Sequence, residues 1–376
     1  MRIYFVAGET SGDNHGAALM RALRQLHSNI EFLGRGGPQM KQVAGDQFLD
    51  WNAEAGVVGL WEVVKHYPYF RREFHRTLKE IARTKPDAVV LIDYPGFNLR
   101  LARTLHEGSL GGKIIYYISP QVWAWNRSRI PKMARWLDLM LCIFPFESEL
   151  YERSGLRAIF VGHPMIENLE AKRSTTVRAP HLIGIFPGSR LREVRQLLPI
   201  LLETMQHLHE QRPDLHFKIA AASEALARLI RDELQPAISG IGQVEVLAGQ
   251  AAEIMQQSEA GIVASGTATL EAAFFRMPFV LVYKVAPLTY LAGRLLIEVK
   301  HLGMPNVLAG REIVPEFIQH KAQPAAIARE VLDLLENQSR RAQMQADFDE
   351  VIAKLGKGGA NEAAARAILA TVQPQA

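Results

Sequence analysis

The chain has 376 residues, of which 48% are hydrophobic and 22% are charged, so it can bury a normal core and is not intrinsically disordered. This length predicts two domains. The net charge is only +4, and no block of Lys and Arg interleaved with aromatic residues occurs, which argues against a nucleic-acid-binding protein. The one cysteine, Cys142, lies in an apolar run, so no intramolecular disulfide can form.

Neither a signal peptide nor a membrane-spanning segment is predicted. The apolar run at 1–7 is too short for a signal sequence, and Glu9 follows it closely. No apolar run approaches the ~18 residues that a spanning helix needs. We therefore expect a cytoplasmic protein that is soluble or peripheral at a membrane.

The first residues predict the beginning of a doubly wound α/β fold. Residues 1–7 predict a strand, 8–13 a glycine-bearing turn and 17–23 a helix. The turn lacks the G-x-G-x-x-G pattern, which argues against a dinucleotide site. Its two acids, Glu9 and Asp13, would repel a pyrophosphate and favour an uncharged, hydroxyl-rich group. Alternatively, they are ordinary helix-start charges.

An apolar and aromatic stretch with a basic edge covers residues 56–72. One interpretation is a helix packed in the core. The other is a surface that enters a bilayer interface or binds acyl chains, because the basic residues cluster at one end. The residues assigned to this acceptor or membrane surface are Val57, Val58, Leu60, Trp61, Val64 and Tyr67.

Two unalternating apolar runs predict fully buried parallel strands at residues 88–92 and 114–118. Asp93 directly follows the first strand, at the end where open α/β sheets place their chemistry. A segment that carries Trp123 and Trp125 follows the second strand. The two indoles either stack on a sugar ring or pack within the fold.

A polar segment at 172–180 predicts the connection to a second α/β domain. The strand–turn–helix order restarts there, with a strand at 182–186, then Gly188-Ser189-Arg190 and a helix from Glu193. Further strands are predicted at 137–144, 158–161, 216–220, 244–247, 261–263 and 279–282, and helices at 324–335, 340–355 and 360–372. The expected domains are 1–168 and 169–355, with a C-terminal helix at about 356–376 that packs back on the first domain.

The stretch from Ala264 to Glu271, Ala-Ser-Gly-Thr-Ala-Thr-Leu-Glu, lies between a short apolar strand and a predicted helix. A Ser-Gly-Thr turn at this point directs backbone N–H groups toward one place, and this arrangement binds phosphate. Thr267 and Thr269 add hydroxyl donors, and Glu271 is placed to accept hydrogen bonds from a ribose. The alternative is an ordinary strand–helix junction with a Ser/Thr cap.

Together these features predict a cleft between two domains with the layout of a glycosyltransferase. The second domain offers Gly188-Ser189-Arg190 and Ser265-Gly266-Thr267 to a nucleotide diphosphate, and the first offers Asp93 as a base for a hydroxyl nucleophile. No metal site is predicted, because the only Asp-x-Asp, at Asp347 and Asp349, lies in a predicted helix where residues two apart do not share a face. The arginine and backbone N–H groups would then meet the leaving-group charge, and no cofactor is expected.

Six segments, taken in order, resemble the lipid-A-disaccharide synthase family and cover Met1 to about Gln323. The segments are AGETSGD at 7–13, IDYPGFN at 92–98, SPQVWAW at 119–125, PGSR at 187–190, ASGTATLE at 264–271 and PNVLAGRE at 305–312. The resemblance implies a glycosyltransferase B fold, with two Rossmann-like doubly wound domains. It also implies that UDP-2,3-diacylglucosamine condenses with 2,3-diacylglucosamine 1-phosphate (lipid X), with inversion, to give the lipid A disaccharide 1-phosphate and UDP. The implied location is the inner face of a Gram-negative inner membrane, whose anionic surface is then a partner.

The resemblance also assigns roles to individual residues. Asp93 matches the family's candidate base, and Glu9 matches an acid in its glycine loop. The residues assigned to the UDP or donor site are Gly188, Ser189, Arg190, Ser265, Gly266, Thr267, Ala268, Thr269, Glu271 and Asn306. Two positions depart from the family pattern. Gly96 replaces a common second acid, which concentrates the base role on Asp93 or on Glu9, and Lys284 replaces an arginine, which loses bidentate geometry.

Three other functions are compatible with these residues. A UDP-sugar epimerase of the same fold would need no lipid acceptor. An NAD-linked oxidoreductase is disfavoured by the missing G-x-G-x-x-G pattern. A non-catalytic protein at the membrane surface would bind lipid X without turnover.

Overall fold

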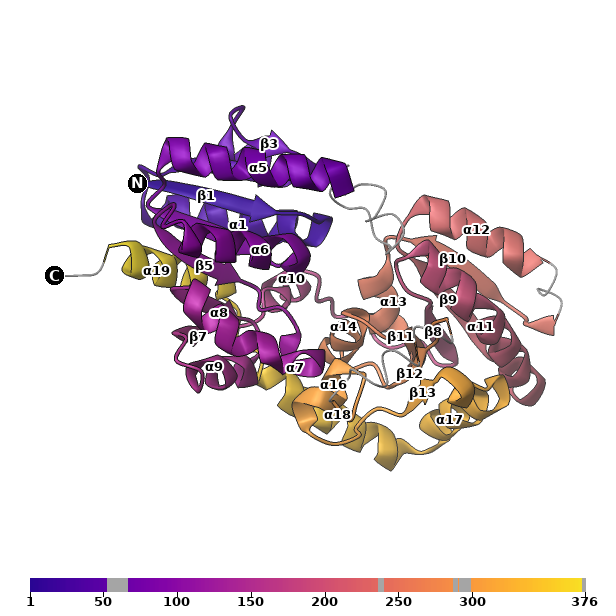
Figure 1. The fold of residues 1–376 in the computed structure, drawn as a ribbon. Helices are drawn as coiled ribbons and strands as arrows, with labels where there is room; N and C mark the ends of the chain where they lie inside the picture. Colours follow the sequence, from indigo (N-terminus) through magenta and orange to yellow (C-terminus); the bar gives the residue numbers. More distant parts are fainter. Residues whose placement is uncertain (53–66, 236–239, 287–289, 291–298, 374–376) are drawn as a thin grey trace. The chain divides into compact units, whose positions relative to one another are not determined.

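Two parallel β-sheets, each accompanied by helices, organise the chain (Figure 1). The computed structural model describes residues 1–52, 67–235, 240–286, 290 and 299–373. Two units are present: Met1–Pro164 together with Leu355–Ala376 form unit 1, and Met165–Lys354 form unit 2.

The sheet of unit 1 has the strand order β3-β2-β1-β4-β5-β6-β7, and all its pairs are parallel. Its central strands are buried at nearly every residue, because helices cover a parallel sheet on both faces. The strands are β1 (Arg2–Ala7), β2 (Glu31–Gly36), β3 (Leu49–Asp50), β4 (Ala88–Ile92), β5 (Lys113–Tyr117), β6 (Leu139–Cys142) and β7 (Ala158–Phe160).

The helices of unit 1 form two groups, as expected when the direction of strand addition reverses. Helix α1 contacts α2 and α19, while α6 contacts α5 and α8. The helices are α1 (Thr10–Leu26), α2 (Pro38–Ala44), α5 (Tyr67–Thr84), α6 (Pro95–Glu107), α7 (Val122–Trp125), α8 (Ile130–Trp136), α9 (Pro145–Glu152) and α19 (Ala360–Val372).

One predicted boundary in unit 1 is wrong. Helix α1 begins at Thr10, so most of the turn predicted at 8–13 is helical, and the helix predicted from Ala17 begins a full two turns earlier. The glycines in this segment serve close packing instead of a turn. A Cβ atom at Gly16 would come within 2.4 Å of the Met40 sulfur.

The sheet of unit 2 has the strand order β10-β9-β8-β11-β12-β13, again entirely parallel. The strands are β8 (Leu182–Phe186), β9 (His216–Ala221), β10 (Val244–Ala248), β11 (Ala260–Ala264), β12 (Phe279–Tyr283) and β13 (Glu316–Ile318). The helices are α10 (Met165–Glu170), α11 (Leu191–Gln211), α12 (Glu224–Leu234), α13 (Ala251–Gln257), α14 (Ala268–Phe274), α16 (Met304–Ala309), α17 (Pro324–Glu336) and α18 (Gln338–Ala353).

The strand orders confirm the predicted α/β class with two doubly wound sheets. In each unit the order runs outward in both directions from the first strand, so the topology switches between β1 and β4 in unit 1 and between β8 and β11 in unit 2. Open α/β sheets bind ligands beyond the carboxyl ends of the strands at such a switch point. The last residues of these strands are neighbours, with Ala7 beside Ile92 and Phe186 beside Val263.

The predicted acceptor or membrane surface lies largely outside the described residues. This applies to Val57, Val58, Leu60, Trp61 and Val64. Tyr67 is the first residue of α5, but its side chain also falls outside the described part. Within the described ranges, no helix combines the length and the apolar content needed to span a bilayer.

Candidate active site

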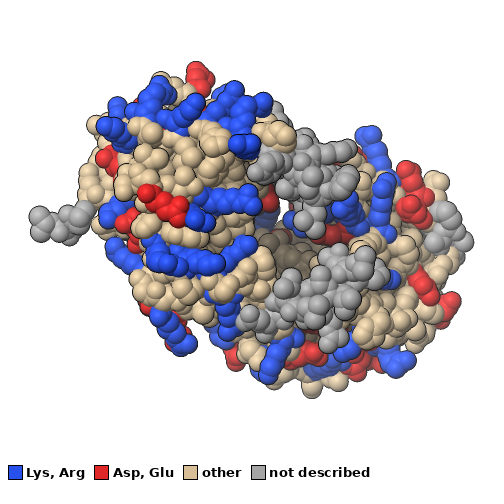
Figure 2. Space-filling model, in the orientation of Figure 1, with Lys and Arg blue, Asp and Glu red and all other residues tan. Residues whose placement is uncertain are grey.

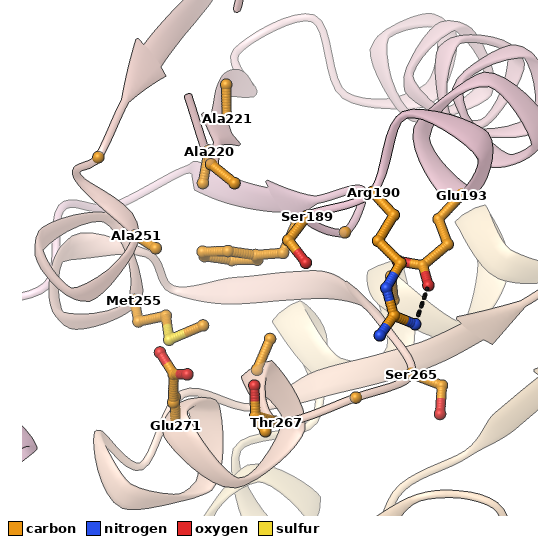
Figure 3. A pocket seen from close by; sticks show the side chains of 17 residues that line it. Ser189, Arg190, Glu193, Ala220, Ala221, Ala251, Met255, Ser265, Thr267 and Glu271 are labelled. Carbon is orange, nitrogen blue, oxygen red and sulfur yellow. Dashed lines mark hydrogen bonds and ion pairs between the residues drawn. The ribbon is translucent and has the colours of Figure 1, made fainter. Parts of the chain in front are cut away.

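A pocket of about 430 Å³ opens at the carboxyl ends of β8 and β11, at the switch point of unit 2 (Figure 3). Its walls come from the turns that follow these strands and from the neighbouring segments after β9 and β10. The lining residues are Phe186, Gly188, Ser189, Arg190, Glu193, Ala220, Ala221, Ala222, Gly249, Ala251, Met255, Ala264, Ser265, Gly266, Thr267, Ala268 and Glu271.

Two glycine-containing turns make the polar wall of this pocket. Gly188 has φ +104° and Gly266 has φ +147°, backbone conformations that residues with a Cβ atom rarely adopt. An added Cβ at Gly266 would meet no atom within 4 Å, so this backbone faces open space. The Thr269 hydroxyl donates to the Gly266 carbonyl at 2.7 Å and closes the turn from below. Such bare turns let a ligand approach main-chain N–H groups closely.

The charged side chains of the pocket are Arg190 and two acids. Arg190 contacts Glu193 at 3.2 Å, and its side chain is 61% exposed. An exposed ion pair is worth little, so an incoming anion can compete for the guanidinium. Burial raises the pKa of Glu271, while the Lys172 charge and a hydrogen bond from Thr267 act in the opposite direction. Glu271 lies at the far end of the pocket from Arg190 (Figure 3).

Apart from Glu271, the end of the pocket away from Arg190 is lined by small and apolar side chains. Ala220 and Ala221 end β9, and Ala251 and Met255 belong to α13 (Figure 3). The alanines leave room for a flat ring beside Met255, and a polar end beside an apolar end is typical of a small-molecule site. The sequence analysis missed this wall. The signal in the sequence was the predicted strand at 216–220, which ends beside the first strand of the second domain and so lies close to its switch point.

Two residues assigned to the donor site do not line the pocket. Thr269 is buried beneath the Gly266 turn. The buried Asn306 side chain donates to the Val314 carbonyl and to Glu316, both at 2.8 Å, and accepts from the N–H groups of Ile313 and Val314. These four bonds use the whole capacity of an amide, so Asn306 fixes the segment before β13.

In unit 1, two carboxylates follow the strands that flank the switch point. Glu9 follows β1 and is the N-cap residue of α1, and Asp93 follows β4. The backbone of Asp93 has φ +44° and that of Tyr94 has φ +49°. Consecutive non-glycine residues in this region cost free energy and persist only where the surroundings fix them.

The surroundings of Asp93 fix its backbone through the carbonyl group. The Asn98 amide donates to the Asp93 carbonyl at 2.8 Å, and the Tyr116 hydroxyl donates to it at 2.5 Å. Asn98 is fully buried and also donates to the Ile92 carbonyl at 3.1 Å. The Asp93 carboxylate is therefore held in place by its own main chain. Asn98 and Tyr116 are positioning residues that the sequence analysis did not single out.

The pKa of Asp93 is raised to about 6, mainly by burial and secondly by the nearby Glu9 charge, while a main-chain hydrogen bond from Tyr94 opposes the shift. A carboxylate with this pKa is a stronger base than a free aspartate and is still mostly ionised at neutral pH. The residue before Glu9 is Gly8, which packs directly against Tyr94, the residue after Asp93. A Cβ atom there would lie 2.4 Å from the Tyr94 ring.

Asp13 has a structural role, which corrects the expectation that it contacts a hydroxyl-rich ligand. Its buried carboxylate accepts hydrogen bonds from the N–H groups of Gly37 (3.0 Å), Gln39 (3.0 Å) and Met40 (2.8 Å). These donors lie at the beginning of α2, where N–H groups have no partner within the helix. Asp13 therefore caps α2 from α1.

The two tryptophans after β5 lie in the short helix α7 and have different surroundings. Trp123 is buried, and its indole N–H donates to Glu147 at 2.9 Å. Trp125 is 39% exposed and carries the Arg129 guanidinium 5.0 Å from its ring. Trp123 thus packs within the fold, and only Trp125 has a face open to a ligand.

No three His, Cys, Asp or Glu side chains gather as a possible metal site anywhere in the part of the chain that the structure describes.

Comparison with known proteins identifies relatives of the whole chain. The family model for lipid-A-disaccharide synthetase matches residues 3–371. A lipid-A-disaccharide synthase from Geobacter sulfurreducens is 40% identical over 377 residues, which cover 98% of this chain and 96% of the relative.

Solved structures that resemble the chain share its fold at low identity. A putative UDP-N-acetylglucosamine 2-epimerase from Listeria monocytogenes has a TM-score of 0.67 and 14% identity, covering 100% of this chain and 97% of its own. The calicheamicin glycosyltransferase CalG4 has a TM-score of 0.58 and 15% identity, with coverages of 100% and 99%. Epimerases and glycosyltransferases share this glycosyltransferase B architecture, so the fold alone does not separate them. The family match, which covers nearly every residue, separates them, and the chain belongs to the lipid-A-disaccharide synthetase family.

Proposed function

We propose that the chain is an inverting, UDP-sugar-dependent hexosyltransferase. It would transfer the sugar of UDP-2,3-diacylglucosamine to 2,3-diacylglucosamine 1-phosphate and release UDP. One feature common to both units carries the proposal: each switch point bears groups suited to chemistry. Unit 2 has a pocket with a polar and an apolar end, and unit 1 has an aspartate with a pKa suited to a general base.

The pocket of unit 2 suits a uridine diphosphate. The diphosphate would bind at the polar end, to the main-chain N–H groups around Gly188-Ser189 and Ser265-Gly266 and to the Arg190 guanidinium. These groups supply positive charge without a metal ion, which meets the charge that develops on the leaving group. The uracil ring would occupy the slot beside Ala221, and Glu271 would accept hydrogen bonds from the ribose.

Asp93 would act on the acceptor. As the 6-hydroxyl oxygen bonds to the anomeric carbon, its proton passes to the Asp93 carboxylate and the bond from that carbon to the UDP oxygen breaks. One displacement inverts the α-linked donor to a β-linked product. Glu9 is the second candidate base, and its charge keeps the pKa of Asp93 raised.

The outer face of α5 supports a peripheral position on an anionic membrane at its cytoplasmic side. The exposed titratable side chains of this helix, apart from one histidine, are Arg and Lys: Arg71, Arg72, Arg76, Lys79 and Arg83. Of the two acids of α5, Glu73 is buried and Glu80 is partly exposed, and the buried Arg35 pairs with Glu73 at 3.0 Å and with Glu80 at 2.7 Å. Lys and Arg side chains accordingly gather along this edge of unit 1 (Figure 2). Such a cationic face attracts anionic lipids.

Two measurements test the proposed function. UDP release should require both the donor and lipid X, and mass spectrometry should detect the disaccharide 1-phosphate. UDP-sugar conversion without a lipid acceptor would support an epimerase instead, and binding of lipid X without turnover would support a non-catalytic protein. For the membrane position, vesicles with anionic lipid should retain the protein more strongly than neutral vesicles. The double variant Lys79→Glu, Arg83→Glu should reduce this difference, and equal retention would contradict it.

A further inference from the structure

Strand β5 leaves the sheet of unit 1 through an unfavourable backbone conformation. Ile118, the first residue after β5, has φ +65°, and a β-branched residue in this region is a genuine outlier. The outlier lies next to Asp93, because the Asp93 N–H donates to the Tyr117 carbonyl at 3.0 Å. Something must therefore hold the chain in this conformation beside the candidate base.

A buried hydrogen-bond network lies directly beyond Ile118. Glu147, at the beginning of α9, is fully buried. One of its carboxylate oxygens accepts from the Trp123 indole N–H at 2.9 Å, and the other accepts from the Phe144 N–H at 3.1 Å. The Ser119 hydroxyl faces Glu147 and opposes the rise in its pKa, and the same hydroxyl lies 2.8 Å from that of Tyr151.

The network joins α9 to both ends of the segment that follows β5. Ser119 is the second residue of this segment, and Trp123 lies in its helix α7. No cation pairs with Glu147 among the residues that the structure describes. The polar and titratable groups that face it are Ser119 after β5, Trp123 of α7, Cys142 of β6, the Phe144 N–H and Tyr151 of α9. The Phe144 contact caps the first turn of α9. The Trp123 contact goes beyond this cap and ties α9 to the segment after β5, although a buried carboxylate without a cation costs free energy.

We propose that Glu147 is a positioning residue of the acceptor side, which holds the Ser119–Trp125 segment in place beside Asp93 through Trp123 and Ser119. This inference rests on the proposed function, in which Asp93 deprotonates the acceptor. The ionised carboxylate offers only acceptors to these donors, whereas the protonated form carries an O–H group that needs an acceptor of its own. Burial raises the pKa of Glu147 to about 7. The side chain therefore changes its protonation state, and with it its hydrogen bonds, at pH values near neutrality.

The kinetic test compares Glu147→Gln with Glu149→Gln, a matched change at an exposed position of the same helix. The amide has one oxygen acceptor and must turn its NH₂ group toward a donor, so the segment shifts. We expect kcat/KM for lipid X to fall about tenfold in Glu147→Gln, with the Kd for UDP unchanged, and both values to stay normal in Glu149→Gln. Equal acceptor kinetics in the two variants would overturn the inference, and so would a parallel loss of UDP affinity, which indicates general damage.

A spectroscopic test reads the contact itself. In protein with ¹⁵N-labelled tryptophan, the indole resonance of Trp123, assigned with Trp123→Phe, should titrate near pH 7 in the wild type and not in Glu147→Gln. If the chemical shift of this indole resonance changes neither with pH nor with the Glu147→Gln substitution, the inference is overturned. If Glu147→Gln does not fold, Trp123→Phe takes its place in the kinetic test with the same expected split. Wild-type protein without turnover refutes the proposed function and this inference together, whereas an active wild type with a normal Glu147→Gln refutes the inference alone.

Discussion

Replacement of Asp93 by asparagine should remove most of the activity and at the same time stabilise the folded protein. Asparagine keeps the shape of the side chain and an oxygen that accepts from the Tyr94 N–H, but it cannot take a proton. A general base contributes about 10²–10⁴-fold to a rate, so turnover should fall by that factor while UDP binding stays the same.

The stability gain follows from the pKa of Asp93. Between 3.8, its ordinary value, and about 6 the difference corresponds to about 3 kcal/mol. Because the folded state binds this proton more tightly than the unfolded state, the free energy of unfolding of the wild type falls as the pH rises from about 4 through 6. In Asp93→Asn the side chain does not titrate, so the free energy of unfolding does not fall in this way. This variant should be more stable than the wild type by up to about 3 kcal/mol at pH 8, or roughly 6–12 °C in Tm, and show no such gain at pH 4.

Two assays check these expectations. The pH profile of kcat/KM in the wild type should rise about tenfold per pH unit below about 6, and Asp93→Asn should lack this steep limb. Thermal unfolding at pH 4 and pH 8 measures the stability difference, with Asp46→Asn, an exposed aspartate of the same unit, as the control. Near-normal turnover in Asp93→Asn, or a gain in Tm that is equal at both pH values, would refute the reasoning.

Three further variants probe the donor pocket, the support of Asp93 and the segment before β13. Arg190→Ala should weaken UDP binding at least about tenfold by calorimetry, whereas Arg192→Ala, exposed on the same helix, should not; equal affinities would remove Arg190 from the site. Tyr116→Phe removes the donor to the Asp93 carbonyl and should lower kcat about tenfold with normal UDP affinity, and an unchanged kcat would contradict this positioning role. Asn306→Ala breaks four buried hydrogen bonds and should lower the free energy of unfolding by about 2–4 kcal/mol in urea titrations; a smaller loss would mean that these bonds do not hold the segment.

The central strands and the residues that follow them could be predicted from the sequence, because each depends on a local pattern. The apolar runs at 88–92 and 182–186 are β4 and β8 to the residue. The short, half-exposed strands β3 and β13 carry no such run, and they were not predicted. Their pairing is decided by the neighbouring strand, which lies far away in the sequence.

The partners of the polar side chains could not be predicted, because distance in the sequence hides them. Asp13 caps a helix that begins 25 residues later, and Glu147 meets an indole 24 residues earlier. From the sequence, Asp13 looks like a helix-start charge, and nothing singles out Glu147. In the structure Asp13 caps another helix, whereas Glu147 caps its own helix and also accepts from a buried indole, and only the tertiary contacts show these partners.

Glu9→Gln decides which acid of unit 1 is the base. The Glu9 charge is the second cause of the raised pKa of Asp93, after burial. If Asp93 is the base, removal of that charge lowers the pKa of Asp93, so the acid limb of the pH profile should move below pH 6 while turnover at pH 8 stays within a few-fold. If Glu9 is the base, turnover at pH 8 falls by about 10²–10⁴ and the limb disappears. The two outcomes differ in sign at low pH, because in the first case the variant is faster than the wild type at pH 5, and in the second it is slower at every pH.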